Sequence, residues 1–252
     1  MQIRWRERFR AFGIHFIATA AVAACAAWLI FGVWFPAPYD ALAGGSKLFL
    51  LIASCDLVLG PLLSLVVYDS QKSRGKLVFD YIVIAILQLG SLVYGVSVVS
   101  KARPVYVAFV GDRLEVVAAQ DLKPTELTAA RDPAYRHVPF TGVRFVAVRV
   151  PPEDHNDALF ESLAGNEEAG RPRFYVPYEA ARAEILAHAK PLDELVRHHP
   201  EAAATIAAAR AQVDVPDERL RWLPLRYGMV FWTALIDTQT GKPVRYLELD
   251  PY

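Results

Sequence analysis

Three long apolar stretches before residue 100 constrain this chain more than any other feature of its sequence. They cover residues 11–35, 48–67 and 77–99, and each is long enough for the roughly 20 residues that cross a ~30 Å hydrocarbon layer as a helix. The prolines and charged residues lie mostly after this region. The sequence therefore predicts a membrane domain, residues 1–100, with three transmembrane helices, followed by one polar domain, residues 101–252.

The positions of the basic residues predict how the helices are oriented. Several flank the first stretch or fill the loop between the second and third: Arg4, Arg6, Arg8, Arg10, Lys72, Arg74 and Lys76. The loop 36–47 contains only one basic residue, Lys47. By the positive-inside rule, we expect the N-terminus and the loop around Lys72 in the cytoplasm and everything after the third helix outside it.

Composition excludes two classes of site in the polar domain. The formal net charge is zero, and no basic segment remains to bind nucleic acid. Both cysteines, Cys25 and Cys55, lie inside apolar stretches, so the polar domain can hold neither a disulfide nor a thiolate metal site.

Polar residues inside the predicted helices are candidates for an intramembrane interaction. Asp56 and Gln88 are equally far from the cytoplasmic ends of their helices, so their side chains can meet across the hairpin. An ionisable residue at this depth costs roughly 2.5–3.5 kcal/mol and requires a partner. Two interpretations remain open: Asp56 joins the protein's own helices, or it receives a polar group from the membrane helix of a partner.

Small and helix-breaking residues surround these two positions. Gly60 and Pro61 predict a kink in the second helix, and Ser91 and Gly95 form a small-residue face on the third. Such a face suits either a guest helix or the protein's own packing. Nearer the cytoplasmic side, His15 and Asp80 are expected to form a polar pair.

The pattern of the polar domain predicts an α+β fold with a mainly antiparallel sheet and helices on one of its faces. Strands are expected at 105–110, 114–118, 143–150, 222–227, 230–237 and 244–249, and helices at 157–164, 178–189 and 192–211. Turn residues separate several of these strands, at 111–112 and 237–241.

No pattern of catalytic, cofactor-binding or metal-binding residues is present in the sequence. The acidic cluster around His155 precedes a predicted helix, where carboxylates commonly interact with free amide groups. His198 and His199 are adjacent and cannot both bind one metal from a helix. We therefore expect a protein that is not an enzyme and needs no cofactor.

Motifs along the whole chain resemble a known family. They are Asp56-Leu-Val-Leu-Gly60-Pro61-Leu-Leu-Ser64, Leu87-Gln88, Tyr94-Gly95, Arg103-Pro104-Val-Tyr106, Gly111-Asp112-Arg113, Asp237-Thr-Gln-Thr-Gly241 and Leu249-Asp-Pro-Tyr252. This pattern resembles the TfpX/TfpZ family of type IV pilin accessory proteins. Leu114 departs from it, since phenylalanine often follows the Asp-Arg pair there.

The resemblance implies an inner-membrane protein with a periplasmic domain that supports the stability, assembly or surface display of a cognate pilin. A pilin subunit is anchored in the membrane by one N-terminal helix before assembly, and its globular head lies outside. Both domains of this chain could therefore contact it. The partners implied are a type IV pilin and the lipid bilayer. Two alternatives are a membrane sensor with a periplasmic ligand-binding domain and a membrane enzyme that modifies pilin.

Overall fold

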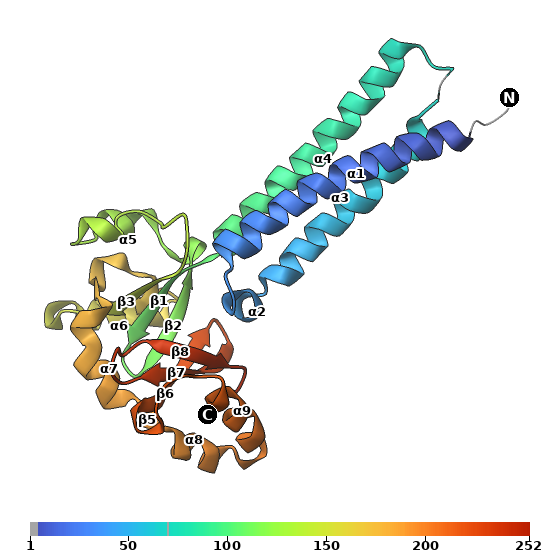
Figure 1. The fold of residues 1–252 in the computed structure, drawn as a ribbon. Helices are drawn as coiled ribbons and strands as arrows, with labels where there is room; N and C mark the ends of the chain where they lie inside the picture. Colours follow the sequence, from blue (N-terminus) through green and yellow to red (C-terminus); the bar gives the residue numbers. More distant parts are fainter. Residues whose placement is uncertain (1–4, 70) are drawn as a thin grey trace. The chain divides into compact units, whose positions relative to one another are not determined.

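The chain divides into two compact units, Met1–Arg103 and Pro104–Tyr252. A computed structural model describes residues 5–69 and 71–252 (Figure 1). Arg4, one of the basic residues used to predict orientation, lies outside the described residues.

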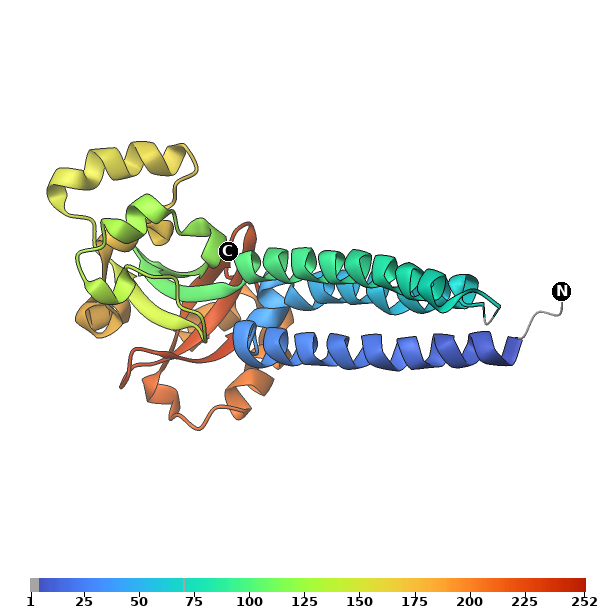
Figure 2. The same ribbon diagram turned by 90° about the horizontal axis from the view of Figure 1, so that it is seen from above.

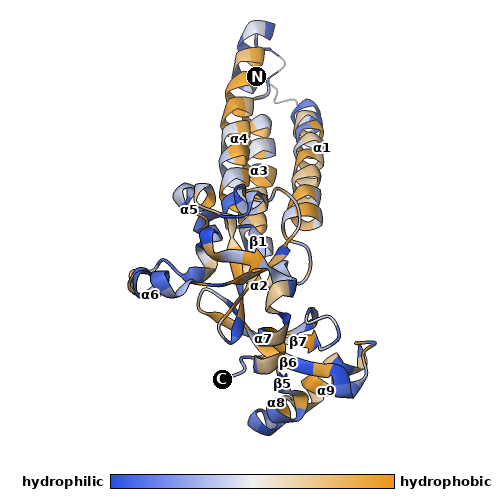
Figure 3. Ribbon diagram, turned by 90° about the vertical axis from the view of Figure 1, so that its left-hand side faces the viewer, coloured by the Kyte–Doolittle hydropathy of each residue, from blue (hydrophilic) through white to orange (hydrophobic). Residues whose placement is uncertain are grey.

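Long helices dominate the first unit. Helix α1 spans Trp5–Leu29 and continues as a π-helical segment, Ile30–Trp34, and the short α2 spans Tyr39–Ala43. Helices α3 and α4 span Gly45–Val67 and Arg74–Ala102. Figures 2 and 3 show α3 between α1 and α4. The three predicted long helices are confirmed, and each extends a few residues beyond its apolar stretch at one end or both.

Apolar side chains on these helices face outward. Trp28, Val66 and Tyr94 each expose more than 70 % of their surface, and apolar residues continue along all three helices in Figure 3. Length and composition alone allow all three to cross a bilayer. Outward apolar side chains are what contact with lipid requires, because a soluble bundle buries them instead.

A small core closes one end of this unit. Ile30, Trp34, Phe35 and Val99 are buried together there. Gly45 opens α3 beside this core, and a Cβ at that position would lie 2.6 Å from the ring of Phe35. Glycine therefore allows the chain to turn from α2 into α3 against an aromatic ring.

The second unit contains an eight-stranded sheet. Its strands follow the order β4-β3-β1-β2-β6-β7-β8, and β5 pairs with β6. The strands are β1 Pro104–Val110, β2 Arg113–Ala118, β3 Arg144–Val148, β4 Tyr175–Pro177, β5 Lys190–Pro191, β6 Leu220–Tyr227, β7 Val230–Asp237 and β8 Pro243–Leu247.

The sheet is mixed, which corrects the prediction of a mainly antiparallel one. The hairpin β1–β2 is antiparallel, but β3 lies parallel to β1 and β6 lies parallel to β2. Parallel neighbours require long crossover connections, and local turn signals carry no information about them.

Both faces of the sheet are buried at its centre. Strand β1 is buried at six consecutive positions, and successive strand residues point to opposite faces. The helices here are α5 Pro124–Thr128, α6 His155–Leu163, α7 Arg182–His188, α8 Leu192–His198 and α9 Ala203–Ala211.

The helix predicted over 192–211 is divided in two. Helix α8 ends at His198, and His199 takes φ −129° and ψ 65°, outside the helical region. Pro200 follows, and a proline disfavours the helical conformation of the residue before it. The break lets Leu195 of α8 and Ile206 of α9 both reach the core against β6, β7 and β8.

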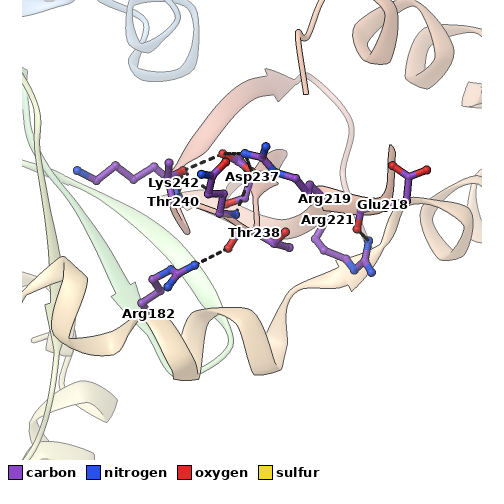
Figure 4. Close-up of polar contacts among 9 residues, drawn as sticks. Arg182, Glu218, Arg219, Arg221, Asp237, Thr238, Thr240 and Lys242 are labelled. Atoms are coloured by element: carbon purple, nitrogen blue, oxygen red, sulfur yellow. Dashed lines mark hydrogen bonds and ion pairs between the residues drawn. The ribbon is translucent and has the colours of Figure 1, made fainter. Parts of the chain in front are cut away.

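A buried carboxylate organises the turn between β7 and β8 (Figure 4). Both oxygens of Asp237 accept hydrogen bonds from Arg219, and one also accepts from the backbone N–H of Gln239 at 2.9 Å. Burial opposes ionisation, but the Gln239 amide and the Arg219 guanidinium outweigh it and lower the pKa of Asp237. The Gly241 carbonyl accepts from Tyr178 at 2.7 Å, and Gly241 has φ +71°.

Candidate functional site

Polar side chains from all three long helices meet inside the first unit. The Nδ1 atom of His15 on α1 shares a hydrogen bond with the hydroxyl of Ser64 on α3. The Nε2 atom of His15 lies 2.7 Å from Oε1 of Gln88 on α4. Since that amide oxygen only accepts, Nε2 carries a hydrogen, and in a neutral ring Nδ1 accepts from Ser64. One imidazole therefore connects three helices.

Gln88 extends this network to α3. Its Nε2 donates to the backbone carbonyl of Asp56 at 3.3 Å. Gly60 provides the space, because a Cβ there would lie 1.9 Å from Nε2 and 2.6 Å from Cδ of Gln88. A side chain at position 60 would displace the amide from both of its partners. Helix α3 continues through the neighbouring Pro61.

The Asp56 carboxylate has a different partner from the one expected. Its Oδ1 accepts from the Ser91 hydroxyl at 2.5 Å, and Gln88 binds the Asp56 backbone instead. Asp56 and Gln88 lie close together as predicted. Gln88 contacts the Asp56 backbone, however, and the Asp56 carboxylate contacts Ser91. Among the residues that the structure describes, the second carboxylate oxygen of Asp56 has no hydrogen-bond partner.

The small-residue face of α4 packs against α3. A Cβ at Gly95 would lie 2.5 Å from Cγ2 of Ile52, and Ser91 one turn earlier reaches Asp56. Of the two uses predicted for this face, the structure shows the protein's own packing.

His15 and Asp80 have separate partners, which corrects the predicted polar pair. Asp80 Oδ2 lies 2.8 Å from Nζ of Lys72, and the same ammonium donates to the Val67 carbonyl at 2.9 Å. Lys72 thus provides a hydrogen-bond donor to a carbonyl at the C-terminal end of α3, where the helix dipole favours a cation. His15 lies further from the end of its helix than expected, because α1 begins at Trp5.

An apolar groove begins at this polar network. A cavity of about 240 Å³ is lined by α1, α3 and α4 and includes His15, Asp56 and Gln88 in its wall. A second cavity of about 750 Å³ shares His15 and Gln88 with the first. We call these two neighbouring cavities the membrane groove.

Several small residues of α1 line the first of the two cavities. Ala18, Ala23 and Ala26 line it from that helix. Small side chains allow two helix backbones to approach closely in lipid, where association depends on packing and hydrogen bonds. The groove therefore combines a surface suited to one more helix with a carboxylate in its wall.

The family-motif residues after the long helices have structural contacts. The Arg103 guanidinium lies 5.6 Å from the centre of the Trp34 ring, and Pro104 opens strand β1. Asp112 follows Gly111, which has φ +59° in the turn between β1 and β2. Proline is tolerated at the first residue of a strand, where a missing N–H costs least.

Arg113 pairs with a buried carboxylate. Its Nε lies 2.7 Å from Oε1 of Glu115, which is 4 % exposed, and Arg226 approaches the same oxygen at 3.8 Å. Burial raises the pKa of Glu115, and the two guanidinium groups oppose that shift.

A polar cavity of about 460 Å³ lies beside Glu115 in the second unit. Its cations are engaged within the chain, since Arg226 pairs with Glu167 and Arg171 with Glu161. In residues 5–69 and 71–252, no group of three or more His, Cys, Asp or Glu side chains is arranged to hold a metal ion. The membrane groove is therefore the stronger candidate site.

Comparison with known proteins shows the family. A family model described as "Fimbrial assembly protein FimB" matches residues 3–44. The "Fimbrial assembly protein, serogroup I" of Dichelobacter nodosus is 36 % identical over 182 residues, which is 71 % of this chain and 70 % of that protein. The chain belongs to the fimbrial assembly protein family.

Two further fimbrial assembly proteins from the same organism are also similar to this chain. The "Fimbrial assembly protein, serogroup E1" is 35 % identical over 71 % of this chain and 70 % of its own length. The "Fimbrial assembly protein, serogroups C1 and C2" is 39 % identical over 118 residues, which cover 47 % of this chain and 90 % of that protein. No solved structure matches the chain.

Proposed function

We propose that this member of the fimbrial assembly protein family is a non-enzymatic accessory protein of the inner membrane. It supports the stability, assembly or surface display of a cognate type IV pilin by holding the pilin's membrane helix in the groove. Its N-terminus lies in the cytoplasm and its second unit in the periplasm. The relatives' names support a role in assembly, and the basic residues before α1 support the orientation.

The observation that carries this proposal is Asp56 in the groove wall, one of whose carboxylate oxygens has no hydrogen-bond partner in the described part of the chain. Ser91 engages Oδ1 and leaves Oδ2 without a partner among the described residues. A carboxylate in an apolar cavity is costly, so a donor or a cation from a guest helix would stabilise it. The small residues of α1 would allow that helix to pack closely.

The test compares a deletion strain with strains carrying single substitutions. Loss of the protein should lower the amount of pilin or of surface pili without changing pilin transcription. Asp56→Asn keeps an oxygen that accepts from Ser91 but cannot become anionic. We expect Asp56→Asn to accumulate normally and to support fewer pili.

Asp80→Asn is the matched control, because Asp80 pairs with Lys72 outside the groove. It should leave pili near the wild-type level. Normal pilin and normal pili in the deletion strain would remove the proposed function. Normal pili with Asp56→Asn would show that Asp56 only joins the protein's own helices and does not contact the pilin.

A further inference from the structure

Helix α6 in the second unit exposes three large apolar side chains on one face. Leu159, Phe160 and Leu163 are 57, 70 and 78 % exposed, whereas Ala158 is buried. At about 100° per residue, the three exposed side chains lie within roughly a quarter to a third of the helix circumference. Figure 2 shows α6, in yellow, projecting from the rest of this unit. We call these three side chains the α6 patch.

A buried guanidinium group, that of Arg171, contacts the inner side of α6. Arg171 is 2 % exposed, and its Nη2 donates to the carbonyl of Ala158 at 3.2 Å and to that of Asn166. Its Nη1 also lies 3.5 Å from the Glu161 carboxylate. These contacts fix which side of α6 faces the domain, so the patch is presented in a defined orientation before any partner arrives.

The segment that contains the patch is acidic, and two of its carboxylates pair with arginines elsewhere in the chain, Glu161 with Arg171 and Glu167 with Arg226. Residues 151–170 contain six carboxylates and neither lysine nor arginine: Glu153, Asp154, Asp157, Glu161, Glu167 and Glu168. Apolar residues within a charged rim are typical of protein interaction sites, and the sign of the rim selects the partner.

We propose that the α6 patch binds the folded, soluble part of a partner protein through an apolar surface surrounded by lysine or arginine. Resting on the proposed function, this partner is the globular head of the pilin. The acidic rim disfavours a bilayer, because helices that lie on membranes are rich in Lys and Arg and bind anionic lipid.

The experiment places a photo-crosslinking amino acid at Phe160 of the full chain in the pilus-bearing host. Met229, which is 92 % exposed between β6 and β7, is the matched control position. We expect pilin, detected with an antibody, in the product from position 160 and not in that from position 229. Leu163 is the second position if replacing Phe160 lowers the level of the chain.

Charge reversal tests the acidic rim. Asp157→Lys should reduce the crosslink from position 160 by about tenfold or more, and Asp157→Asn should reduce it less, because only the first places a repelling charge beside the patch. Equal crosslinking from positions 160 and 229, or a product with lipid or with a second copy of this chain, would overturn the proposal.

A crosslinker at Val22, in the groove wall, separates this inference from the proposed function. A pilin product from position 22 with none from position 160 would overturn the role of the patch and leave the groove intact. No pilin product from either position, together with normal pili in the deletion strain, would overturn both.

Discussion

Gly60 leaves space for the Gln88 side chain. The effect of Gly60→Ala on stability should therefore have opposite signs in the presence and in the absence of that side chain. A Cβ at position 60 would lie 1.9 Å from Nε2 of Gln88, so Gly60→Ala must displace the amide. The displaced amide loses its bonds to His15 and to the Asp56 carbonyl. Gln88→Ala removes all three of the atoms that lie nearest to this Cβ, so the same substitution no longer displaces an amide there.

The expected magnitude follows from these contacts. Hydrogen bonds between membrane helices contribute about 0.6 kcal/mol on average and up to about 1.7 kcal/mol, so two lost bonds cost about 1–3 kcal/mol. Replacing glycine by alanine within a helix gains up to about 1 kcal/mol. Gly60→Ala should therefore destabilise the wild type and stabilise Gln88→Ala. The coupling free energy between the two substitutions should be about 1–3 kcal/mol.

The assay is unfolding of the full chain by SDS in mixed micelles, followed by tryptophan fluorescence, for the wild type, both single variants and the double variant. Contributions from the second unit cancel in this cycle. Gly90→Ala is the control, because nothing lies within 4 Å of a Cβ at that position. It should change stability equally in both backgrounds. A coupling below about 0.5 kcal/mol for Gly60 and Gln88 would refute the proposed contact.

Three further outcomes test other parts of the structure. Reporter fusions after residue 100 should be active in the periplasm and fusions near Lys72 in the cytoplasm, and the reverse result would overturn the orientation. Gly95→Leu should separate α3 from α4 and lower the level of the folded chain in the membrane, because its side chain would overlap Ile52. Asp237→Asn should lower the free energy of unfolding by about 1.5–3 kcal/mol at pH 7. Because the pKa of Asp237 is lower in the folded state, its contribution is present above about pH 4 and lost as the pH falls, so the two proteins should converge in acid urea titrations.

Features that depend on neighbours in the chain could be predicted from the sequence. Continuous apolar stretches specify the three long helices, since a segment in lipid must satisfy its own backbone hydrogen bonds. Alternation and turn residues specify β1 with β2 and β7 with β8. The break between α8 and α9 could also have been predicted, because Pro200 disfavours the helical conformation of His199. The alanine-rich pattern around it favoured a single helix instead.

Counting residues from the helix ends predicted that Asp56 and Gln88 lie near one another, and Gln88 does contact the Asp56 backbone. It could not give the rotation of each helix about its axis, which decides whether Gln88 meets a carboxylate or a backbone carbonyl. It also missed His15 as the residue joining three helices, because α1 begins before its apolar stretch.

The sequence by itself determined the local elements, the apolar lengths and the charge of each segment. Only the tertiary structure decided the parallel pairs β1–β3 and β2–β6, the position of Gln88 over Gly60, and the outward face of α6. The strand pairs and the Gln88 contact join residues far apart in the chain, and the outward face of α6 depends on how Arg171 packs beneath that helix. Such contacts depend on how the elements pack, and no short-range periodicity records which distant surfaces will meet.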